Sequence, residues 1–211
     1  MRGIILRKIG IECIVLYVWV FLIVWVNVQN TITGSFIIGT ILPMLLYIHY
    51  VDCRRIPDYL RLRVDRWLSG ISWGLGLGLV FISISLIKAV LIGQGKLWFA
   101  WPAGYWLNPV ITASTVEELF FRGFLLNKFA EKTSFFRANF LVSLMFIALH
   151  IPVWSTSGIV GWDILGNATY VGILSGLFGY LYYRTQSLWT PIILHAANNY
   201  LTLITVGMVY Q

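Results

Sequence analysis

The sequence predicts an all-α fold, a polytopic membrane helix bundle of about seven transmembrane helices. Hydrophobic residues fill 59% of the 211 positions and charged residues only 11%, and the mean hydropathy is +0.81. A soluble domain carries about a quarter charged residues, so this chain has too little polar surface to cover a core in water. No long polar stretch interrupts the apolar segments, and we therefore expect one membrane domain over residues 1–211.

The apolar segments that supply the expected spans are residues 11–28, 36–51, 70–92, 102–126, 137–150, 162–183 and 191–208. The first follows a basic start, as the core of a signal peptide does. It is longer than such a core, however, and no small-x-small cleavage site follows it. After the second span, residues 52–68 mix Arg and Asp with apolar and aromatic residues, and we expect them to lie partly on the membrane surface.

The third span carries Gly70, Gly74 and Gly78, and this four-residue spacing places small residues on one helix face for close packing. The surroundings are apolar and no strand precedes these glycines, which argues against a nucleotide-binding loop. The fifth span is short for a complete crossing, and we expect Pro152 to end its helix soon after His150. The sixth span has small residues on its packing faces: Gly172, Ser175, Gly176 and Gly179.

Basic residues alternate between the two predicted sides of the membrane. They precede the first span and follow the second, fourth and sixth: Arg2, Arg7, Lys8, Arg54, Arg55, Arg61, Arg63, Arg66, Lys128, Lys132, Arg137 and Arg184. Apart from Lys96, the intervening loops have almost none. This positive-inside pattern places the N-terminus in the cytoplasm and the C-terminus outside. The pattern explains the net charge of +7 by membrane topology and by contact with anionic lipid headgroups, not by binding of nucleic acid.

Cys13 and Cys53 are too few and too far apart for a redox or metal motif.

The fourth span contains an acidic pair, Glu117 and Glu118, with Arg122 one turn further on. Ionisable groups are costly inside a membrane, so three of them indicate a functional site. Adjacent helical residues point about 100° apart and residues four apart share a face. Arg122 is therefore expected to pair with Glu118 as a structural brace, which leaves Glu117 free for chemistry. The alternative is that all three charges serve packing or register.

Two histidines occupy later spans. His150 closes the fifth span, and His195 lies near the start of the seventh with Asn199 four residues on and Asn198 beside it. These side chains can form hydrogen bonds between helices, or they can direct their polar groups into one cavity. Counting 1.5 Å per residue from the cytoplasmic ends places Glu117 at roughly 15 Å, His150 at roughly 20 Å and His195 at roughly 10 Å. One water-accessible cavity can hold all three at such depths.

The order of these motifs resembles the CPBP family of intramembrane proteases, the CAAX-prenyl-protease and bacteriocin-processing type also called the Abi family. The residues that carry the resemblance are Glu117, Glu118 and Arg122 (EExxxR), then Phe146 and His150 (FxxxH), then His195 and Asn199 (HxxxN). The resemblance covers residues 100–205, and the first three spans carry no family motif.

The resemblance implies hydrolysis of a peptide bond within the membrane. Glu117 is then the general base for a water held between it and His150. His195 and Asn199 stabilise the oxyanion, and Glu118, Arg122 and Phe146 support the site. One Glu with two His is able to bind zinc, but HExxH is missing and Asn is a poor zinc ligand, so we expect no metal and no other cofactor.

The expected partners are the lipid bilayer and a membrane-embedded or membrane-associated peptide or protein substrate. Short loops and small size favour a bacterial cytoplasmic membrane and an unprenylated substrate. A non-catalytic immunity or scaffold protein is the alternative, and a proton-coupled transporter is a more distant one. Retention of Glu117, His150, His195 and Asn199 together favours the protease, because a scaffold has no need of all four.

Overall fold

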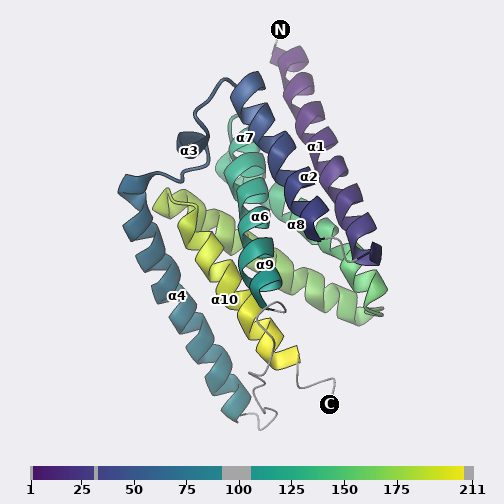
Figure 1. The fold of residues 1–211 in the computed structure, drawn as a ribbon, viewed down its shortest axis with the longest axis vertical. Helices are drawn as coiled ribbons and strands as arrows, with labels where there is room; N and C mark the ends of the chain where they lie inside the picture. Colours follow the sequence, from purple (N-terminus) through teal and green to yellow (C-terminus); the bar gives the residue numbers. More distant parts are fainter. Residues whose placement is uncertain (1, 31–32, 92–105, 207–211) are drawn as a thin grey trace. The chain divides into compact units, whose positions relative to one another are not determined.

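The computed structural model describes residues 2–30, 33–91 and 106–206, and throughout these ranges the regular structure is helical (Figure 1). This confirms the all-α prediction for the described residues. Parts of three expected spans lie outside them, namely residue 92, residues 102–105 and residues 207–208, and so does Lys96. The chain divides into two compact units, which we call the first unit (residues 1–60 and 119–180) and the second unit (residues 61–118 and 181–211). The single membrane domain stays a prediction.

The first unit packs α1 against α2 and α8, and η3 against the same two helices. Its elements are α1 (Arg2–Asn30), α2 (Thr33–Leu46), η1 (Tyr47–Val51), α3 (Ile56–Tyr59), η3 (Leu119–Leu126), α7 (Asn127–Ala130), α8 (Phe135–Thr156) and most of α9 (Trp162–Thr185). The Tyr17 hydroxyl of α1 donates a hydrogen bond of 2.8 Å to the Met145 carbonyl of α8.

The second unit is built around α10 (Trp189–Val206), which lies alongside α4 (Val64–Leu91) in Figure 1. Two shorter elements also pack on α10: the π-helical η2 (Leu107–Ala113) and α6 (Ser114–Glu118). The helix that carries the acidic pair is therefore held directly against the helix that carries His195.

The predicted role of the regularly spaced glycines is confirmed. A Cβ on Gly70 would lie 2.0 Å from the Ser187 Oγ, and one on Gly74 would lie 2.9 Å from the Ile193 Cβ, so α4 approaches α10 too closely for larger residues. The Thr190 hydroxyl uses this closeness to donate to the Gly70 carbonyl at 3.0 Å.

The glycines of α9 pack in the same way on α8. A Cβ on Gly172 would meet the Ile147 Cδ1 at 2.9 Å, and one on Gly179 would meet the Asn139 Oδ1 at 1.9 Å. The Asn139 amide also donates to the Gly176 carbonyl at 2.9 Å. In a bilayer, such close backbone contacts replace the hydrophobic drive that helices have in water.

The prediction that Pro152 ends the fifth helix soon after His150 is wrong. Helix α8 begins at Phe135, continues through Pro152 and ends at Thr156. Proline removes one backbone donor, but apolar helices tolerate this loss where hydroxyls and neighbouring helices supply other bonds. The donor lost at Pro152 is the one that would bond the Ala148 carbonyl. Beyond it, the Thr156 hydroxyl donates to the Pro152 carbonyl at 3.2 Å and to the Val153 carbonyl at 3.0 Å, which holds the last turn of the helix.

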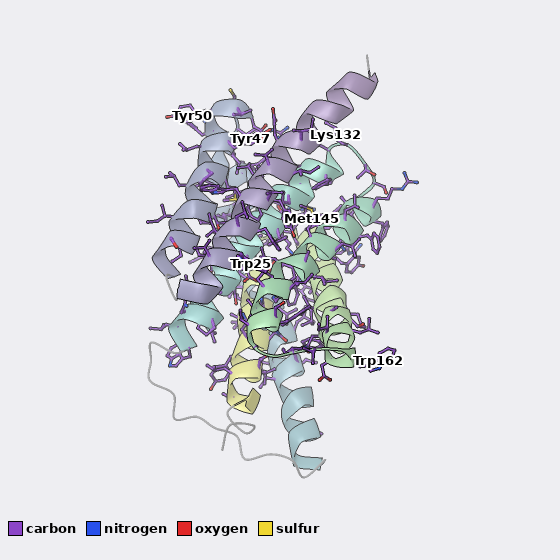
Figure 2. All side chains as sticks on the ribbon, turned by 90° about the vertical axis from the view of Figure 1, so that its right-hand side faces the viewer. Trp25, Tyr47, Tyr50, Lys132, Met145 and Trp162 are labelled. Carbon is purple, nitrogen blue, oxygen red and sulfur yellow. The ribbon has the colours of Figure 1, made fainter. Side chains whose placement is uncertain are left out.

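Three of the described helical stretches are long and apolar enough to cross a membrane: Gly34–Val51, Phe135–Thr156 and Trp162–Thr185. Residues Ile11–Val26 form a shorter apolar helix. Figure 2 shows Tyr47, Tyr50 and Lys132 at one end of the first unit and Trp162 at the other. Aromatic and basic side chains commonly mark the two membrane interfaces. The number of seven spans and the cytoplasmic N-terminus stay predictions.

A buried ion pair lies at the Tyr47 end of the first unit. The Lys128 side chain, 3% exposed, pairs with Asp52, and its Nζ lies 5.1 Å from the centre of the Tyr47 ring. The Tyr47 hydroxyl donates to Glu12 at 2.5 Å. A second, more exposed pair joins Arg54 to Glu131 at 2.8 Å.

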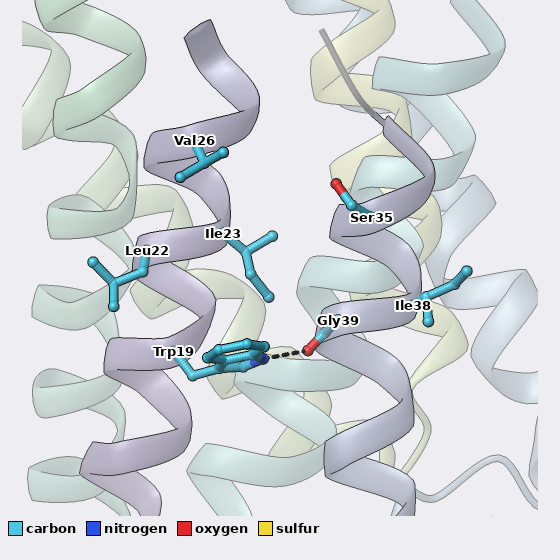
Figure 3. A pocket seen from close by; sticks show the side chains of 7 residues that line it. All are labelled: Trp19, Leu22, Ile23, Val26, Ser35, Ile38 and Gly39. Carbon is cyan, nitrogen blue, oxygen red and sulfur yellow. Dashed lines mark hydrogen bonds between the residues drawn. The ribbon is translucent and has the colours of Figure 1, made fainter. Parts of the chain in front are cut away.

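An apolar pocket of about 500 Å³ lies between α1 and α2 (Figure 3). Its lining residues are Trp19, Leu22, Ile23, Val26, Ser35, Ile38 and Gly39. The Trp19 indole donates to the Gly39 carbonyl at 2.9 Å and joins the two helices at one side of the pocket. None of these lining side chains is ionisable, so the pocket offers no acid or base for catalysis.

Candidate active site

The acidic pair sits in a short α-helical stretch between two π-helical ones. Helix α6 has only the five residues Ser114–Glu118, and it continues without a break from η2 into η3. π-Helical turns are rare in proteins as a whole, but many of those that occur lie at functional sites. Such a turn changes the direction in which the side chains point. The Glu118 and Ser114 side chains are completely buried, whereas the Glu117 side chain is 16% exposed.

His195 of α10 lies between the two glutamates. Its Nδ1 is 2.8 Å from the Glu118 Oε1, and its Nε2 is 3.7 Å from the Glu117 Oε2. The imidazole is nearly as buried as Glu118, with 5% of its side chain exposed. A carboxylate only accepts hydrogen bonds, so Nδ1 carries a proton and Nε2 is the ring atom turned toward Glu117.

Asn199 holds the start of this helical segment against α10. Its Nδ2 donates to the Pro109 carbonyl at 2.9 Å and to the Ser114 Oγ at 3.1 Å. Asn198 donates to the Asn199 Oδ1 at 3.4 Å. Both amide hydrogens of Asn199 are thus engaged within the second unit. To donate to an oxyanion, Asn199 has to give up one of these two hydrogen bonds. The longer of the two is the bond to the Ser114 hydroxyl.

His150 belongs to α8 in the first unit. Its Nδ1 lies 2.9 Å from the Phe146 carbonyl oxygen, one turn earlier on the same helix. A carbonyl cannot donate, so Nδ1 carries the proton of this contact and Nε2 is the ring nitrogen left for other groups. The His150 ring also packs, tilted, beside the rings of Phe146 and Trp154, with centroid distances of 4.7 and 5.7 Å. Both histidines are therefore held through Nδ1 and present Nε2.

Arg122 of η3 is completely buried in the first unit. Its Nη2 donates to the Ser175 carbonyl at 3.1 Å and to the Ser175 hydroxyl at 2.7 Å. The guanidinium carbon lies 4.6 Å from the centre of the Phe146 ring and 5.5 Å from that of Phe178. A buried cation over aromatic faces is a favourable arrangement, worth about 2 kcal/mol when desolvated.

The family model for type II CAAX prenyl endopeptidase Rce1-like proteins matches residues 98–201, about half of the chain. The chain belongs to this family. The predicted family membership is thereby confirmed, and the Rce1-like region contains every residue on which the resemblance was based. No curated protein and no solved structure matches the chain. The family is one of membrane proteases, and together with the apolar helices it makes this an integral membrane protein.

Within the Rce1-like region, the structure brings Glu117, Glu118, His195 and Asn199 together in the second unit. His150 belongs to the first unit, so the predicted water between Glu117 and His150 stays a prediction. The pairing of Glu118 with Arg122 stays a prediction for the same reason. Among the described residues, no three His, Cys, Asp or Glu side chains are arranged as a metal site.

Two polar residues of this region were not predicted from the sequence to take part in the site. Ser114 bonds Asn199, and Ser175 bonds Arg122. Ser114 precedes Glu118 by four residues, so its place on the same helix face was a usable signal. Ser175 was interpreted only as a small packing residue, because nothing in its neighbours on the chain points to a cation.

Proposed function

We propose that this protein is an intramembrane endopeptidase that hydrolyses a peptide bond of a membrane-associated protein or peptide with a water activated by Glu117. The observation that carries the proposal is the buried cluster in which Glu117 and Glu118 flank His195. Ionisable side chains at such depth in an apolar chain are costly, and function is the usual reason for keeping them. Membership in a protease family supports the same reaction.

Glu117 is the better candidate for the general base. The Glu118 side chain is completely buried and accepts the Nδ1–H of His195, whereas Glu117 is partly exposed and can meet a water. In the proposed reaction, Glu117 takes a proton from the water as the water oxygen attacks the substrate carbonyl. Glu117 then passes this proton to the leaving amine, so the base is regenerated.

The other roles follow from the way each side chain is held. His150 presents Nε2 and is proposed to accept the second hydrogen bond of the attacking water. His195, with both ring nitrogens protonated, is proposed to donate from Nε2 to the oxyanion while Glu118 accepts from Nδ1. Asn199 is proposed to donate beside it, by exchanging its bond to Ser114 for one to the oxyanion.

The proposed mechanism uses no metal, since Glu117 transfers the proton and the histidines supply hydrogen bonds to the water and to the oxyanion. We further propose a peptide or membrane-protein substrate without a prenyl group, and a location in a bacterial cytoplasmic membrane. These two proposals rest on the short loops between the apolar segments.

The test compares the N- and C-terminal peptides of membrane proteins from cells that express the wild type, Glu117→Gln or Glu131→Gln. Glu117→Gln keeps the side-chain shape and removes the base. Glu131 lies in a partly exposed ion pair with Arg54, so its substitution is a matched control. Peptide ends that depend on Glu117 but not on Glu131, at equal protein levels, support the protease and identify its substrate. Identical peptide ends in all three samples overturn the proposal and leave a binding or immunity role.

A further inference from the structure

A chain of contacts in the first unit leads from Arg122 to His150. Arg122 is anchored to α9 by its two hydrogen bonds to Ser175. Its guanidinium carbon lies 4.6 Å from the centre of the Phe146 ring on α8. The Phe146 ring in turn lies 4.7 Å from the His150 ring, and the Phe146 carbonyl accepts the Nδ1–H of His150.

We propose that Arg122 is the positioning residue of His150 and acts through the ring of Phe146. The inference rests on the proposed function, in which His150 contacts the attacking water. The Phe146 ring is held by the cation and, edge to face, by the Phe121 ring at 4.9 Å. A ring fixed in this way restricts the His150 rotamer, so that its Nδ1 stays on the Phe146 carbonyl and its Nε2 stays available.

The chemistry of this position calls for arginine. A planar guanidinium bonds in its plane and stacks through its face at the same time, as Arg122 does with Ser175 and Phe146. A lysine ammonium is a compact point charge that is more strongly hydrated, and it cannot do both in one geometry. Arg122 touches neither substrate nor water in this proposal, and its effect on the reaction passes through His150.

The experiment reads the tautomer of His150 without any substrate. Protein labelled with ¹⁵N-histidine is placed in lipid nanodiscs, and the ring nitrogens of neutral His150 are recorded by NMR. The signals are assigned with the His150→Asn variant. The wild type is expected to show one form, protonated at Nδ1. Phe146→Leu removes the aromatic face but keeps an apolar side chain, and it is expected to give a mixture of both tautomers. Arg122→Lys is expected to give the same mixture.

Phe178→Leu is the matched control. Phe178 also contacts the Arg122 guanidinium, at 5.5 Å, but from α9. If Arg122 served packing alone, loss of either ring would have the same effect. We expect Phe178→Leu to keep the single tautomer. The signals of His195 and His49 report whether each variant is folded, and Phe146→Leu provides the test should Arg122→Lys not fold.

Kinetics with the substrate found in the peptide comparison complete the test. Arg122→Lys is expected to lower kcat by roughly 100-fold with little change in KM, because a misplaced catalytic group costs about that much. A single His150 tautomer in both Phe146→Leu and Arg122→Lys would overturn the positioning role and leave proteolysis standing. An inactive wild type with the expected tautomers would instead overturn the proposed function.

Discussion

The Nδ1 of His195 lies 2.8 Å from the Oε1 of Glu118, in a contact that is almost completely buried. The second glutamate of the pair thus orients a histidine on another helix through a direct contact. This relationship separates two properties of Glu118, its ability to accept a hydrogen bond and its charge. The capacity for charge can be removed while the acceptor is kept.

Glu118→Gln keeps an acceptor for the His195 Nδ1–H and removes the charge, whereas Glu118→Ala removes both. We expect the Gln variant to lose roughly 10- to 100-fold in kcat, the usual range for a group that supports a catalytic side chain. The Ala variant should lose more and should also be less stable. The measurement is kcat and KM on the identified substrate. Equal activity of the Gln variant and the wild type would contradict the role of the charge.

The structural and catalytic roles of the contact between Asn199 and Ser114 can be separated in the same way. Ser114→Ala removes one acceptor of the Asn199 amide and should cost about 1 kcal/mol of unfolding free energy, with less than about a tenfold change in kcat/KM. Asn199→Ala should lower kcat by about 10²- to 10³-fold if the amide stabilises the oxyanion. Thermal unfolding and kinetics measure the two effects. Equal losses of activity would mean that Asn199 only holds the helix.

The close packing of α4 on α10 predicts opposite responses at two glycines of one helix. Gly70→Ala forces the Ser187 side chain to move and should cost about 1–3 kcal/mol of unfolding free energy. Gly76→Ala is the control, since no atom lies within 4 Å of the added Cβ, and it should stabilise the helix by up to about 1 kcal/mol. Unfolding in detergent distinguishes them. Similar stability of both variants would contradict the packing observed here.

The buried pair of Lys128 and Asp52 predicts a large loss when one partner is neutralised. Asp52→Asn leaves the Lys128 charge buried without its counter-ion and should cost about 3–5 kcal/mol of unfolding free energy. Arg54→Gln breaks the exposed pair with Glu131 and should cost no more than about 1 kcal/mol. Denaturant unfolding of both variants provides the comparison. A cost below about 1 kcal/mol for Asp52→Asn would show that the site is hydrated.

The mechanism without metal predicts full activity after dialysis against a zinc chelator. Activity should then be unchanged by added zinc at micromolar levels. The control is a zinc peptidase treated in parallel, which must lose activity. Loss of turnover with the chelator, restored by zinc alone, would contradict the proposed role of Glu117 as a base that works without a metal.

The sequence was a good guide to features that recur along a helix. The spacing of Gly70 and Gly74 predicted the packing face, and apolar segments predicted the helices. The end of α8 was predicted wrongly, because the rule that proline stops a helix comes from chains in water, and Pro152 lies in an apolar helix.

The contact of Glu118 with His195 was beyond the sequence for a different reason. The two residues are 77 positions apart, and local periodicity contains no information about which helix lies opposite. The expected Arg122 partner rested on the rule that residues four apart share a face, which holds for an α-helix. From Leu119 to Leu126 the helix is π-helical, and the pairing of Glu118 with Arg122 stays a prediction.

The π-helical turns on both sides of α6 also bear on how such a protein can change during evolution. A wide turn holds one residue more than an α-helical turn, and deletion of a single residue can convert it to α-helix. Such a deletion in η2, between Pro109 and Ser114, would turn Pro109 by about 100° relative to Glu117 and move its carbonyl away from the Asn199 amide. One codon lost would therefore reorient several groups at once, while a substitution would change only one side chain.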